Sequence, residues 1–442
     1  MDLADVIADL FGGEGQVRFS VYDGSSAGPD AAPAHVAVSS PSAWAYLVQA
    51  PGQLGLVRAC IEGAIEIEGD VHTVLRSFRK PQASSVGAEQ LRRLAAEVAR
   101  NAARRVGRPE EEIRLRGRRH SKRRDAEAIS HHYDVSNRFY ELVLGPSMTY
   151  TCAVYPRHDA TLEEAQLEKY DLVARKLALR AGMRLLDVGC GWGGMVLHAA
   201  RHYGVRAIGV TLSRAQAKWA QQAIADAGLG HLAEVRHLDY RDVEETGFDA
   251  VSSIGLTEHI GKARLPAYFQ FLHAKLRPGG RLLNHAIMWP HNIASPLRRR
   301  GFTKRRGLIN RYVFPDGELL SLGHIVGVMQ DAGGFEVRHE ENLREHYAMT
   351  LAAWGANLEE HWDECVAEAG ERRARVWSLY MAGSRLAFER NEIQLHQVLA
   401  VRTEQGHSGM PLRPDWETPR RVPEATAPAQ DDAATVSAVA GS

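Results

Sequence analysis

Short apolar runs alternate with segments of helical periodicity between residues 184 and 290. The apolar runs predict strands, and the segments between them predict helices. Strands that alternate with helices form a parallel sheet covered on both faces, so this region predicts a doubly wound α/β domain. The expected strands are 184–189, 206–211, 234–238, 248–254 and 280–288.

The same patterning outlines the rest of the chain. Segments 335–341 and 395–402 predict two more strands around a mostly helical stretch. Near the amino terminus, β-like runs at 17–22 and 34–38 lie among glycine- and proline-rich turns, which is typical of a small α+β domain. The predicted organisation is a small domain at 1–103, a basic linker at 104–128, a large domain at 129–405 with a helical insertion or lid at 345–394, and a disordered tail at 418–442.

Composition and charge narrow the class of protein. The chain has 442 residues, enough for two domains, and its 54 basic residues balance 54 acidic ones, so only the distribution of charge is informative. Its 4 cysteines are far apart, which argues against a zinc site or a disulfide framework and favours a reducing cytosol. The amino terminus lacks a signal-peptide pattern, and no apolar run approaches the roughly 20 residues that span a bilayer. Any membrane contact is therefore expected to be peripheral.

The strongest chemical signal is segment 185–194, LLDVGCGWGG, in which an apolar strand ends in a glycine-rich turn and leads into a helix near Met195. Its glycines allow a tight turn and a close ligand approach, and the helix amino terminus suits an electron-rich ligand group. No acid follows the second strand to hold a ribose, which weakens an NAD interpretation. The segment indicates a nucleotide-type pocket, with an ordinary turn as the alternative. The next helix is expected to begin with a capping box of Ser213 and Gln216.

Two basic clusters stand out. The first, between Arg104 and Arg124, predicts a linker that is either solvated or attracted to anionic lipid headgroups. No aromatic residues interleave with these basic residues to stack bases, which argues against nucleic acid as a partner. The second cluster, at 298–306, is interpreted either as a holder of headgroup phosphate through forked arginine donors or as a solvated insertion.

Several separated motifs resemble one known family. They are segments 130–137, 148–153, 189–194, 238–242, 258–259, 311–315 and 393–395. In this order they resemble the cyclopropane-fatty-acyl-phospholipid synthases, over roughly residues 125 to 402 and more weakly over the small domain. The resemblance implies a class I methyltransferase, with a Rossmann-like doubly wound sheet whose final strand is antiparallel. It also implies that S-adenosylmethionine alkylates the double bond of an unsaturated phospholipid acyl chain.

The resemblance further implies a two-part site without a metal. Bicarbonate, the expected base, would be held by Cys152, Glu258, His285, the backbone of Ile287, and Tyr347. S-adenosylmethionine would be bound by Tyr150, Thr151, Asp187, Gly189, Gly191, Gly193, Thr211, Gln216, Asp239, Tyr240 and His259. Hydroxyl, imidazole and backbone N–H groups can donate to an oxyanion, and a carboxylate can accept the proton of bicarbonate. Taken singly, a cysteine, histidine or tyrosine of this kind is more typical of a buried structural residue.

Two departures from the family pattern bear on the product. Thr257 stands where many members have an aromatic residue, so one ring face that could stabilise a carbocation is expected to be absent. Ser384 stands where many members have a cysteine, so no covalent cysteine step is expected. The sequence around Thr257 resembles an actinobacterial branch that makes 10-methylene acyl chains, which are precursors of the 10-methyl branch of tuberculostearic acid.

The predicted function is therefore methylation of an oleoyl-type phospholipid chain to a 10-methylene chain, by a cytoplasmic protein at the inner face of the membrane. We also expect a homodimer and a flavin- or NADPH-dependent reductase that acts on the product. Three alternatives remain. They are a cyclopropane synthase with the same substrates, a methyltransferase for a small soluble acceptor, and a catalytically silent lipid-binding subunit.

Overall fold

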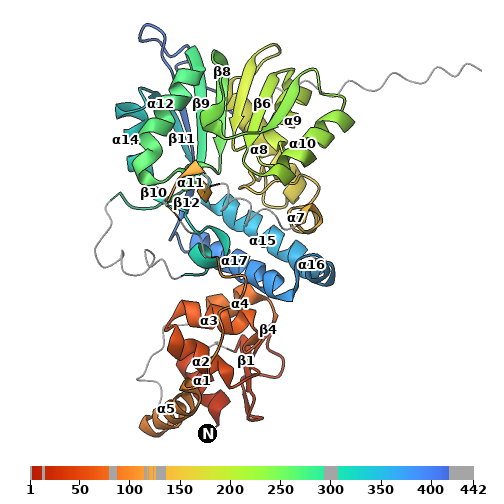
Figure 1. Cartoon of the computed structure of the whole chain (residues 1–442), viewed down its shortest axis with the longest axis vertical. Coiled ribbons are helices and arrows are strands. Elements are labelled where there is room, and N and C mark those ends of the chain that lie inside the picture. The colour runs from red at the N-terminus through yellow and green to blue at the C-terminus, as the bar shows by residue number, and fades with distance from the viewer. Residues whose placement is uncertain are drawn as a thin grey trace, which may run out of the picture.

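A small domain and a large domain lie along the long axis of the molecule, with a layer of helices between them (Figure 1). The computed structural model describes residues 2–11, 15–78, 87–113, 117, 119–122, 124–125, 136–292 and 307–417. Three sequence features lie outside these residues: most of the 130–137 motif, the basic cluster at 298–306, and the tail at 418–442. Within the described ranges, no helix is long and apolar enough to cross a membrane.

The small domain contains a four-stranded sheet that packs against helices. Val17–Val21 (β1) pairs in parallel with Ala34–Val38 (β3), while Ser26–Ala27 (β2) and Glu66–Gly69 (β4) form the antiparallel edges. β1 and β3 alternate buried and half-buried residues, as strands with one face on a core do. The helices are α1 (Leu3–Phe11), α2 (Ser42–Gln49), α3 (Gln53–Ile61), α4 (Val71–Ser77) and α5 (Ala88–Ala102).

An eight-stranded mixed sheet forms the centre of the large domain. Its strands are β5 (Arg184–Val188), β6 (Arg206–Thr211), β7 (Ala233–His237), β8 (Phe248–Ile254), β9 (Leu276–Trp289), β10 (Leu320–Ser321), β11 (Glu336–Asn342) and β12 (Gln394–Val401). The order is β11-β12-β9-β8-β5-β6-β7, with β10 paired to β9. The strand β12 runs antiparallel to both of its neighbours, whereas the strands from β9 to β7 pair in parallel.

Alternate residues of these strands enter separate hydrophobic cores on the two faces of the sheet. One face is covered by α8 (Leu162–Leu177), α9 (Gly194–Tyr203) and α10 (Arg214–Asp226), and the other by α12 (Leu265–Lys275) and α14 (Leu322–Asp331). Leu185 and Leu283 belong to the first core, and their neighbours Leu186 and Leu282 belong to the second. This sorting with a period of two is expected for strands that are covered on both faces.

The predicted fold class and the strands predicted for the large domain are confirmed, although β9 begins earlier, at Leu276. The predicted capping box is only half present. The Ser213 hydroxyl accepts from the backbone N–H of Gln216 at 3.2 Å, but the Gln216 side chain accepts from the Thr211 hydroxyl at 2.9 Å instead of returning to Ser213. The competing hydroxyl at the end of β6 explains why this part of the prediction is wrong.

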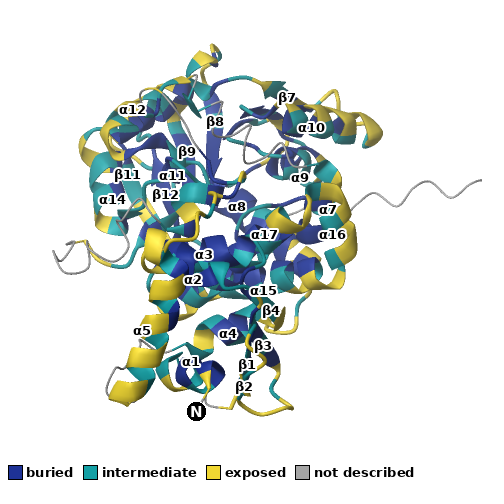
Figure 2. Ribbon diagram, turned by 60° about the horizontal axis from the view of Figure 1, so that its bottom comes forward, coloured by how far each residue is buried: buried dark blue, intermediate teal, exposed yellow. Residues whose placement is uncertain are grey.

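Three helices fill most of the predicted helical stretch and separate the two domains (Figure 1). They are α15 (Arg344–Glu360), α16 (Trp362–Ala369) and α17 (Glu371–Glu389). The helix α17 packs against α15 on one side and against α3 and α4 of the small domain on the other. Figure 2 shows buried residues where α3, α15 and α17 meet. An ion pair of 2.8 Å between His72 Nε2 and Glu389 adds a polar link between α4 and α17.

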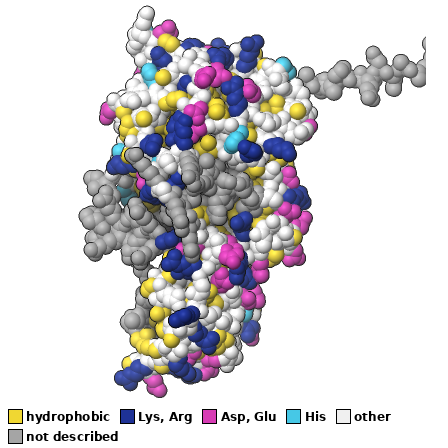
Figure 3. Space-filling model, viewed as in Figure 1, with side chains coloured by type: hydrophobic (Ala, Val, Ile, Leu, Met, Phe, Trp, Pro, Cys, Tyr) yellow, Lys and Arg dark blue, Asp and Glu magenta, His cyan; other side chains and the backbone are white. Residues whose placement is uncertain are grey.

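Ion pairs tie the segment between the domains to both of them. Glu112 is 4% exposed, and its carboxylate lies 2.7 Å from Arg58 Nη2 of α3 and 3.3 Å from Arg311 Nη1 of the large domain. Arg124 and Arg119 approach Asp316 at 2.6 and 3.0 Å. Neither a solvated linker nor a free lipid-binding patch therefore describes Arg119 and Arg124, because their guanidinium groups are used within the protein. On the face shown in Figure 3, basic and acidic side chains are interspersed.

Replacing Asp316 with Asn should destabilise the protein. Burial alone would raise the pKa of the Asp316 carboxyl, but hydrogen bonds from Arg124 and Arg119 outweigh it and hold the pKa below its usual value. A carboxyl of this kind stabilises the fold above its unfolded-state pKa, and the stabilisation is lost as the pH falls through the folded-state pKa. At neutral pH we expect Asp316→Asn to lower the free energy of unfolding by about 3 kcal/mol in urea titrations.

Asp331→Asn, at an exposed position of α14, is the matched control for this variant. It should change the free energy of unfolding by less than about 0.5 kcal/mol. If the difference between wild type and Asp316→Asn does not shrink in acid, the ion pairs are not its source.

Candidate active site

The carboxyl ends of β5, β8 and β9 contribute to one large cavity that continues into the small domain. The cavity has a volume of about 2160 Å³ and is lined by residues of both domains. Ligands of open α/β sheets bind outside the carboxyl ends of the strands, so the position of the cavity follows from the topology. Most of the residues that line it are apolar, and polar residues at the strand ends include Asp187, Glu258 and His285.

The glycine turn after β5 forms one wall of the cavity. Gly189 and Gly191 line it and have φ values of 75° and 56°, which residues other than glycine rarely adopt. A Cβ atom added to Gly191 would meet nothing closer than Gln216 Nε2, at 3.9 Å. The space beside this turn is therefore open, and it lies at the amino terminus of α9. An open cradle at a helix amino terminus fits the close approach of S-adenosylmethionine.

Five other residues of the predicted S-adenosylmethionine set also line the cavity. They are Tyr150, Thr151, Asp187, Gln216 and His259. Asp187 accepts a hydrogen bond of 2.6 Å from the Ser252 hydroxyl, and burial raises the pKa of its carboxyl to about 6. Burial, with the nearby His120, lowers the pKa of His259 to about 4, so this ring is neutral at physiological pH. The His259 ring is therefore uncharged, whereas the Asp187 carboxyl is still mostly ionised at neutral pH.

The remaining four residues of that set do not line the cavity. They are Gly193, Thr211, Asp239 and Tyr240. A Cβ at Gly193 would lie 3.1 Å from the methyl group of Ala220, so this glycine serves helix packing. The Asp239 carboxylate accepts three hydrogen bonds from Arg241, at 2.6 to 2.9 Å. The Thr211 hydroxyl donates to Gln216 and acts on the cavity only through it.

The five residues predicted to hold bicarbonate all line the cavity: Cys152, Glu258, His285, Ile287 and Tyr347. Strand register brings two of their elements together, because Ile254 at the end of β8 pairs with His285 on β9. Glu258 follows on the short helix α11 (Thr257–Ile260), and its Oε1 accepts from the backbone N–H of Ile287 at 2.6 Å. The Ile287 N–H is thus already engaged by Glu258, which differs from the predicted role of this N–H as a ligand donor.

Two buried atoms of this group, Glu258 Oε2 and His285 Nε2, have no hydrogen-bond partner among the described residues. Burial raises the pKa of Glu258 to about 7, against the smaller opposing effect of the Ile287 N–H. Burial likewise lowers the pKa of His285 well below its usual value. Orphaned polar atoms of this kind are costly unless something binds them, and an acid beside a neutral imidazole fits an oxyanion that also carries a proton.

Cys152 is not a nucleophile in this arrangement. Its thiol is fully buried and directed at the carbonyl oxygen of Ala153, at 3.1 Å. Burial raises the pKa of the thiol far above its usual value, so the reactive thiolate does not form. The described residues contain no disulfide and no cluster of three or more His, Cys, Asp or Glu that could hold a metal ion.

The sequence-based prediction missed the polar residues of α8. Lys169 Nζ donates to the Thr151 hydroxyl at 3.0 Å, and Gln166 donates to the Thr151 carbonyl at 2.9 Å. Burial lowers the pKa of Lys169 to about 7, although Cys152 and Asp187 act in the opposite direction. A signal for this was present, because Lys169 and Lys176 occupy positions of the apolar stripe of α8 and are both 0% exposed.

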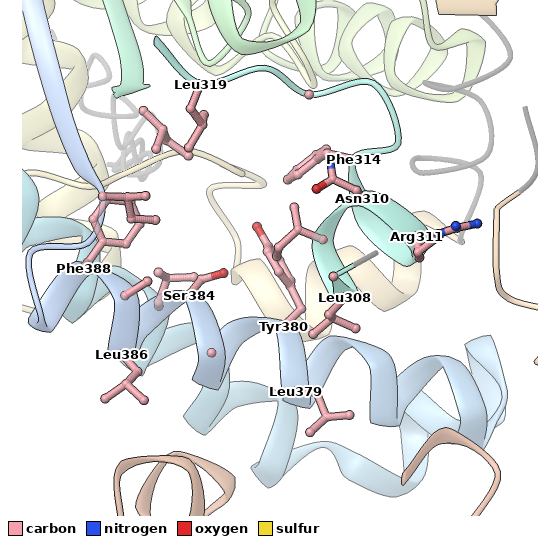
Figure 4. Close-up of a pocket in the computed structure, with 18 of the residues that line it drawn as sticks. Leu308, Asn310, Arg311, Phe314, Leu319, Leu379, Tyr380, Ser384, Leu386 and Phe388 are labelled. Atoms are coloured by element: carbon pink, nitrogen blue, oxygen red, sulfur yellow. The ribbon is translucent and has the colours of Figure 1, made fainter. Parts of the chain in front are cut away.

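Helix α17 supplies another wall, shown in Figure 4. Tyr380 and Ser384 point from α17 toward Phe314, whereas Leu379 and Leu386, which also line the cavity, lie on the opposite side of the helix, toward the small domain (Figure 4). Tyr150 donates to the Tyr380 hydroxyl at 3.1 Å. Aromatic residues recur along the lining: Tyr150, Trp192, Trp289, Phe314, Tyr347, Tyr380 and Phe388. Several aromatic rings therefore lie beside the site.

Thr257, which stands where many family members have an aromatic residue, does not line the cavity. It is 4% exposed, and its hydroxyl donates to the side-chain oxygen of Asn284. Any effect of this residue on a ligand must therefore pass through its neighbours on α11 and β9.

The fold and the arrangement of strand ends define the class of protein, a class I S-adenosylmethionine-dependent methyltransferase. Two similar solved structures have the same architecture. The cyclopropane synthase MmaA2 from Mycobacterium tuberculosis is 32% identical, with a TM-score of 0.58 over 62% of this chain and 98% of that chain. The mycolic acid cyclopropane synthase CmaA1 complexed with SAH and CTAB is 34% identical, with a TM-score of 0.59 over 62% of this chain and 98% of that chain.

The family is shown by sequence. The model of the family described as "Mycolic acid cyclopropane synthetase" matches residues 120–398. A probable fatty acid methyltransferase, Rv3720, of Mycobacterium tuberculosis is 52% identical over 94% of this chain and 99% of its own length. A probable fatty acid methyltransferase of Pseudomonas putida is 41% identical over 82% of this chain and 86% of its own length. The chain belongs to the mycolic acid cyclopropane synthetase family, and the resemblance seen in its motifs is confirmed.

Replacing Gly191 with Ala should weaken binding of S-adenosylhomocysteine at least 10-fold, roughly the effect of a misplaced methyl group in a ligand cradle. The added methyl group would enter the open space beside the turn. Strain from the positive φ should cost about 1 kcal/mol of stability. Calorimetric titration and urea unfolding measure the two effects separately.

Gly228→Ala is the matched control, because Gly228 has a φ of 66°, has nothing within 4 Å of an added Cβ, and does not line the cavity. It should show the same loss of stability and unchanged binding. Equal losses of binding in both variants would contradict a ligand beside Gly191.

Replacing Glu258 with Gln should stabilise the protein at alkaline pH. An acid whose pKa is higher in the folded state takes up a proton on folding, so it destabilises the folded state above that pKa and not below its unfolded-state value. The rise to about 7 corresponds to at most about 3 kcal/mol. We expect urea titrations to show this gain in mildly alkaline buffer and its disappearance once the pH falls below the unfolded-state pKa, about 4.3. Glu360→Gln, at an exposed position of α15, should leave the free energy of unfolding unchanged at both pH values.

Proposed function

We propose that this protein transfers the methyl group of S-adenosylmethionine to the double bond of an unsaturated phospholipid acyl chain and produces a 10-methylene chain. The observation that carries the proposal is a single apolar cavity, joining the glycine turn to the Glu258 and His285 pair and continuing into the small domain. Relatives named as fatty acid methyltransferases, at 52% and 41% identity, support the same acceptor class.

The cavity suits a neutral, weakly nucleophilic alkene. Such a group offers no charge to bind, so the protein must hold it by burial of the acyl chain and orient it against the sulfonium methyl. Apolar side chains of both domains provide that surface, among them Leu54 and Val57 of α3, and Leu351, Leu379 and Leu386 near the layer between the domains. Exclusion of water also protects the carbocation that methyl transfer produces.

The aromatic lining favours a positive charge on the acyl chain. Tyr150, Phe314 and Tyr380 lie together, with ring centroids of Phe314 and Tyr380 separated by 6.1 Å. Ring faces attract cations most strongly in a dry site. The neutral form of His285 and the absence of a thiolate at Cys152 keep competing charge and nucleophiles away from the reacting carbons.

Glu258 and His285 would hold bicarbonate, which supplies the base that removes a proton from the new methyl group. The unpartnered Oε2 of Glu258 can accept the hydrogen of such a ligand, and the unpartnered Nε2 of His285 is placed to contact its oxygen. Tyr347 lines the same region and packs on Phe388 with ring centroids 4.6 Å apart. In this arrangement Ile287 acts by holding Glu258.

The second candidate is a cyclopropane synthase with the same substrates, which the family favours. Cyclopropane mycolic acid synthase 1 of Mycobacterium tuberculosis, a relative, is 36% identical over 61% of this chain and 94% of its own length. After methyl transfer, ring closure with loss of a methyl proton gives the cyclopropane. A hydride shift from the methylated carbon to its neighbour, followed by loss of a methyl proton, gives the methylene chain. The sequence around Thr257 favours the second route.

We also propose that the protein works peripherally at the inner, cytoplasmic face of the membrane, because an acyl chain must be delivered from a bilayer. Reduction of an exocyclic methylene to a methyl branch needs two electrons and two protons. A flavin- or NADPH-dependent reductase is therefore the proposed partner for the product.

The test uses vesicles of an oleoyl phospholipid in which both alkene carbons carry deuterium, with S-adenosylmethionine as donor. The two products have the same mass, so the position of deuterium decides between them. A hydride shift places both deuterium atoms on one carbon, whereas ring closure leaves one on each. Fragmentation by mass spectrometry, with proton NMR of the released chains, reads this difference.

We expect both deuterium atoms on one carbon, and vinylidene protons when unlabelled chains are used. Retention of one deuterium on each carbon would identify the cyclopropane synthase. Glu258→Gln should lower the turnover at least about 100-fold, while Glu360→Gln should not. No transfer to phospholipid by the wild-type protein would contradict both candidates.

A further inference from the structure

Three polar side chains form a row across β11, β12 and β9, next to the candidate reaction site. Gln397 on β12 pairs directly with His285 on β9 and with Glu341 on β11. Directly opposed residues of neighbouring strands point to the same face of a sheet, so these side chains meet. Gln397 and His285 are 0% and 1% exposed. The row therefore runs from a partly exposed carboxylate into the buried site.

Lys176 of α8 covers this row. Its side chain is 0% exposed, and its ammonium group donates to the Glu341 carboxylate and, at 2.7 Å, to Gln397 Oε1. An ammonium group has only hydrogens to offer, so the Gln397 atom that faces it must be the oxygen. The amide nitrogen of Gln397 must then face His285, and it lies 3.3 Å from Nδ1.

The orientation of this amide determines where His285 carries its hydrogen. An amide nitrogen can only donate, so Nδ1 of His285 must accept. Burial lowers the pKa of His285 well below its usual value, and Lys169 and Lys176 act in the same direction, so the ring is neutral and has one N–H. That hydrogen is then on Nε2, the atom without a partner among the described residues.

We propose that Lys176 and Gln397 are positioning residues, which hold His285 as the Nε2–H tautomer so that it donates a hydrogen bond to an oxygen acceptor in the cavity. The assignment of that acceptor to a bicarbonate oxygen rests on the proposed function, whereas the tautomer does not. Glu341 has a supporting part. Burial lowers the pKa of Lys176, whereas Glu341, followed by Glu340, opposes this effect, and the Glu341 carboxylate accepts from the Lys176 nitrogen.

The decisive variant is Gln397→Glu. Its side chain has the same shape and can still accept from Lys176. As a carboxylate paired with Lys176, its second oxygen can only accept, so His285 must place a hydrogen on Nδ1. We expect long-range proton–nitrogen correlation spectra of protein labelled with 15N-histidine to show Nε2–H in the wild type and Nδ1–H in the variant. His285→Gln identifies the signals of this ring.

Gln394→Glu, on the same strand, is the matched control. Gln394 contacts His396 and does not line the cavity, so the His285 signals should not change. Lys176→Met gives an independent test, because without the ammonium the amide is free to turn and both tautomers of His285 should appear. A wild-type His285 with its hydrogen on Nδ1, or a Gln397→Glu protein that keeps Nε2–H, would overturn the proposal.

Turnover separates this proposal from the proposed function. If both hold, Gln397→Glu should lower kcat about 100-fold, the cost of losing one oriented donor, with little change in KM. A reversed tautomer with undiminished turnover would support the positioning roles of Lys176 and Gln397 and contradict the role of His285 in the reaction. Reduced stability with an unchanged tautomer would mean that Gln397 is only structural, which contradicts the proposal.

Discussion

The site depends on one constraint, the burial of Glu258 with only backbone hydrogen bonds, and no cation among the described residues, to offset it. A carboxyl group in this position is costly when ionised, so the structure must bring a hydrogen-bond donor to it without bringing charge. The backbone N–H of Ile287 meets this need at 2.6 Å, and it can do so only because α11 turns back onto β9 directly after β8. The pairing of β8 with β9 thereby also fixes His285 beside the same space.

Helix α8 also places buried charged groups near the site. Its apolar stripe would seal a dry core, but two of its positions carry lysines. Lys169 lines the cavity and donates to Thr151, whereas Lys176 donates to Gln397 and does not line it. Lys176 thus acts on the site through Gln397 and His285, which limits its repulsion of a cation in the cavity while it still orients dipoles.

The sequence predicted the parts of the fold that depend on local periodicity, and it predicted less well what depends on competition between partners. The strands of the large sheet follow from apolar runs, and the position of the site follows from their order. Gln216 shows the limit, because its side chain bonds to Thr211 rather than completing the capping box. Asp239 shows it again, since motif position alone did not reveal that Arg241 engages its carboxylate. The role of Lys176 needed the register of three strands, which no local pattern contains.

The two candidate products lose their proton from the same new methyl group, so one base position serves both. The choice between ring closure and hydride shift must then depend on how the wall of the cavity holds the cation relative to that methyl group. Tyr150, Phe314 and Tyr380 form the aromatic part of this wall. Thr257 does not line the cavity, and its hydroxyl donates a hydrogen bond to Asn284. A threonine at this position can therefore act only through the packing of α11 on β9. Any effect on the proposed product would then come from the shape of the wall rather than from the presence or absence of one ring.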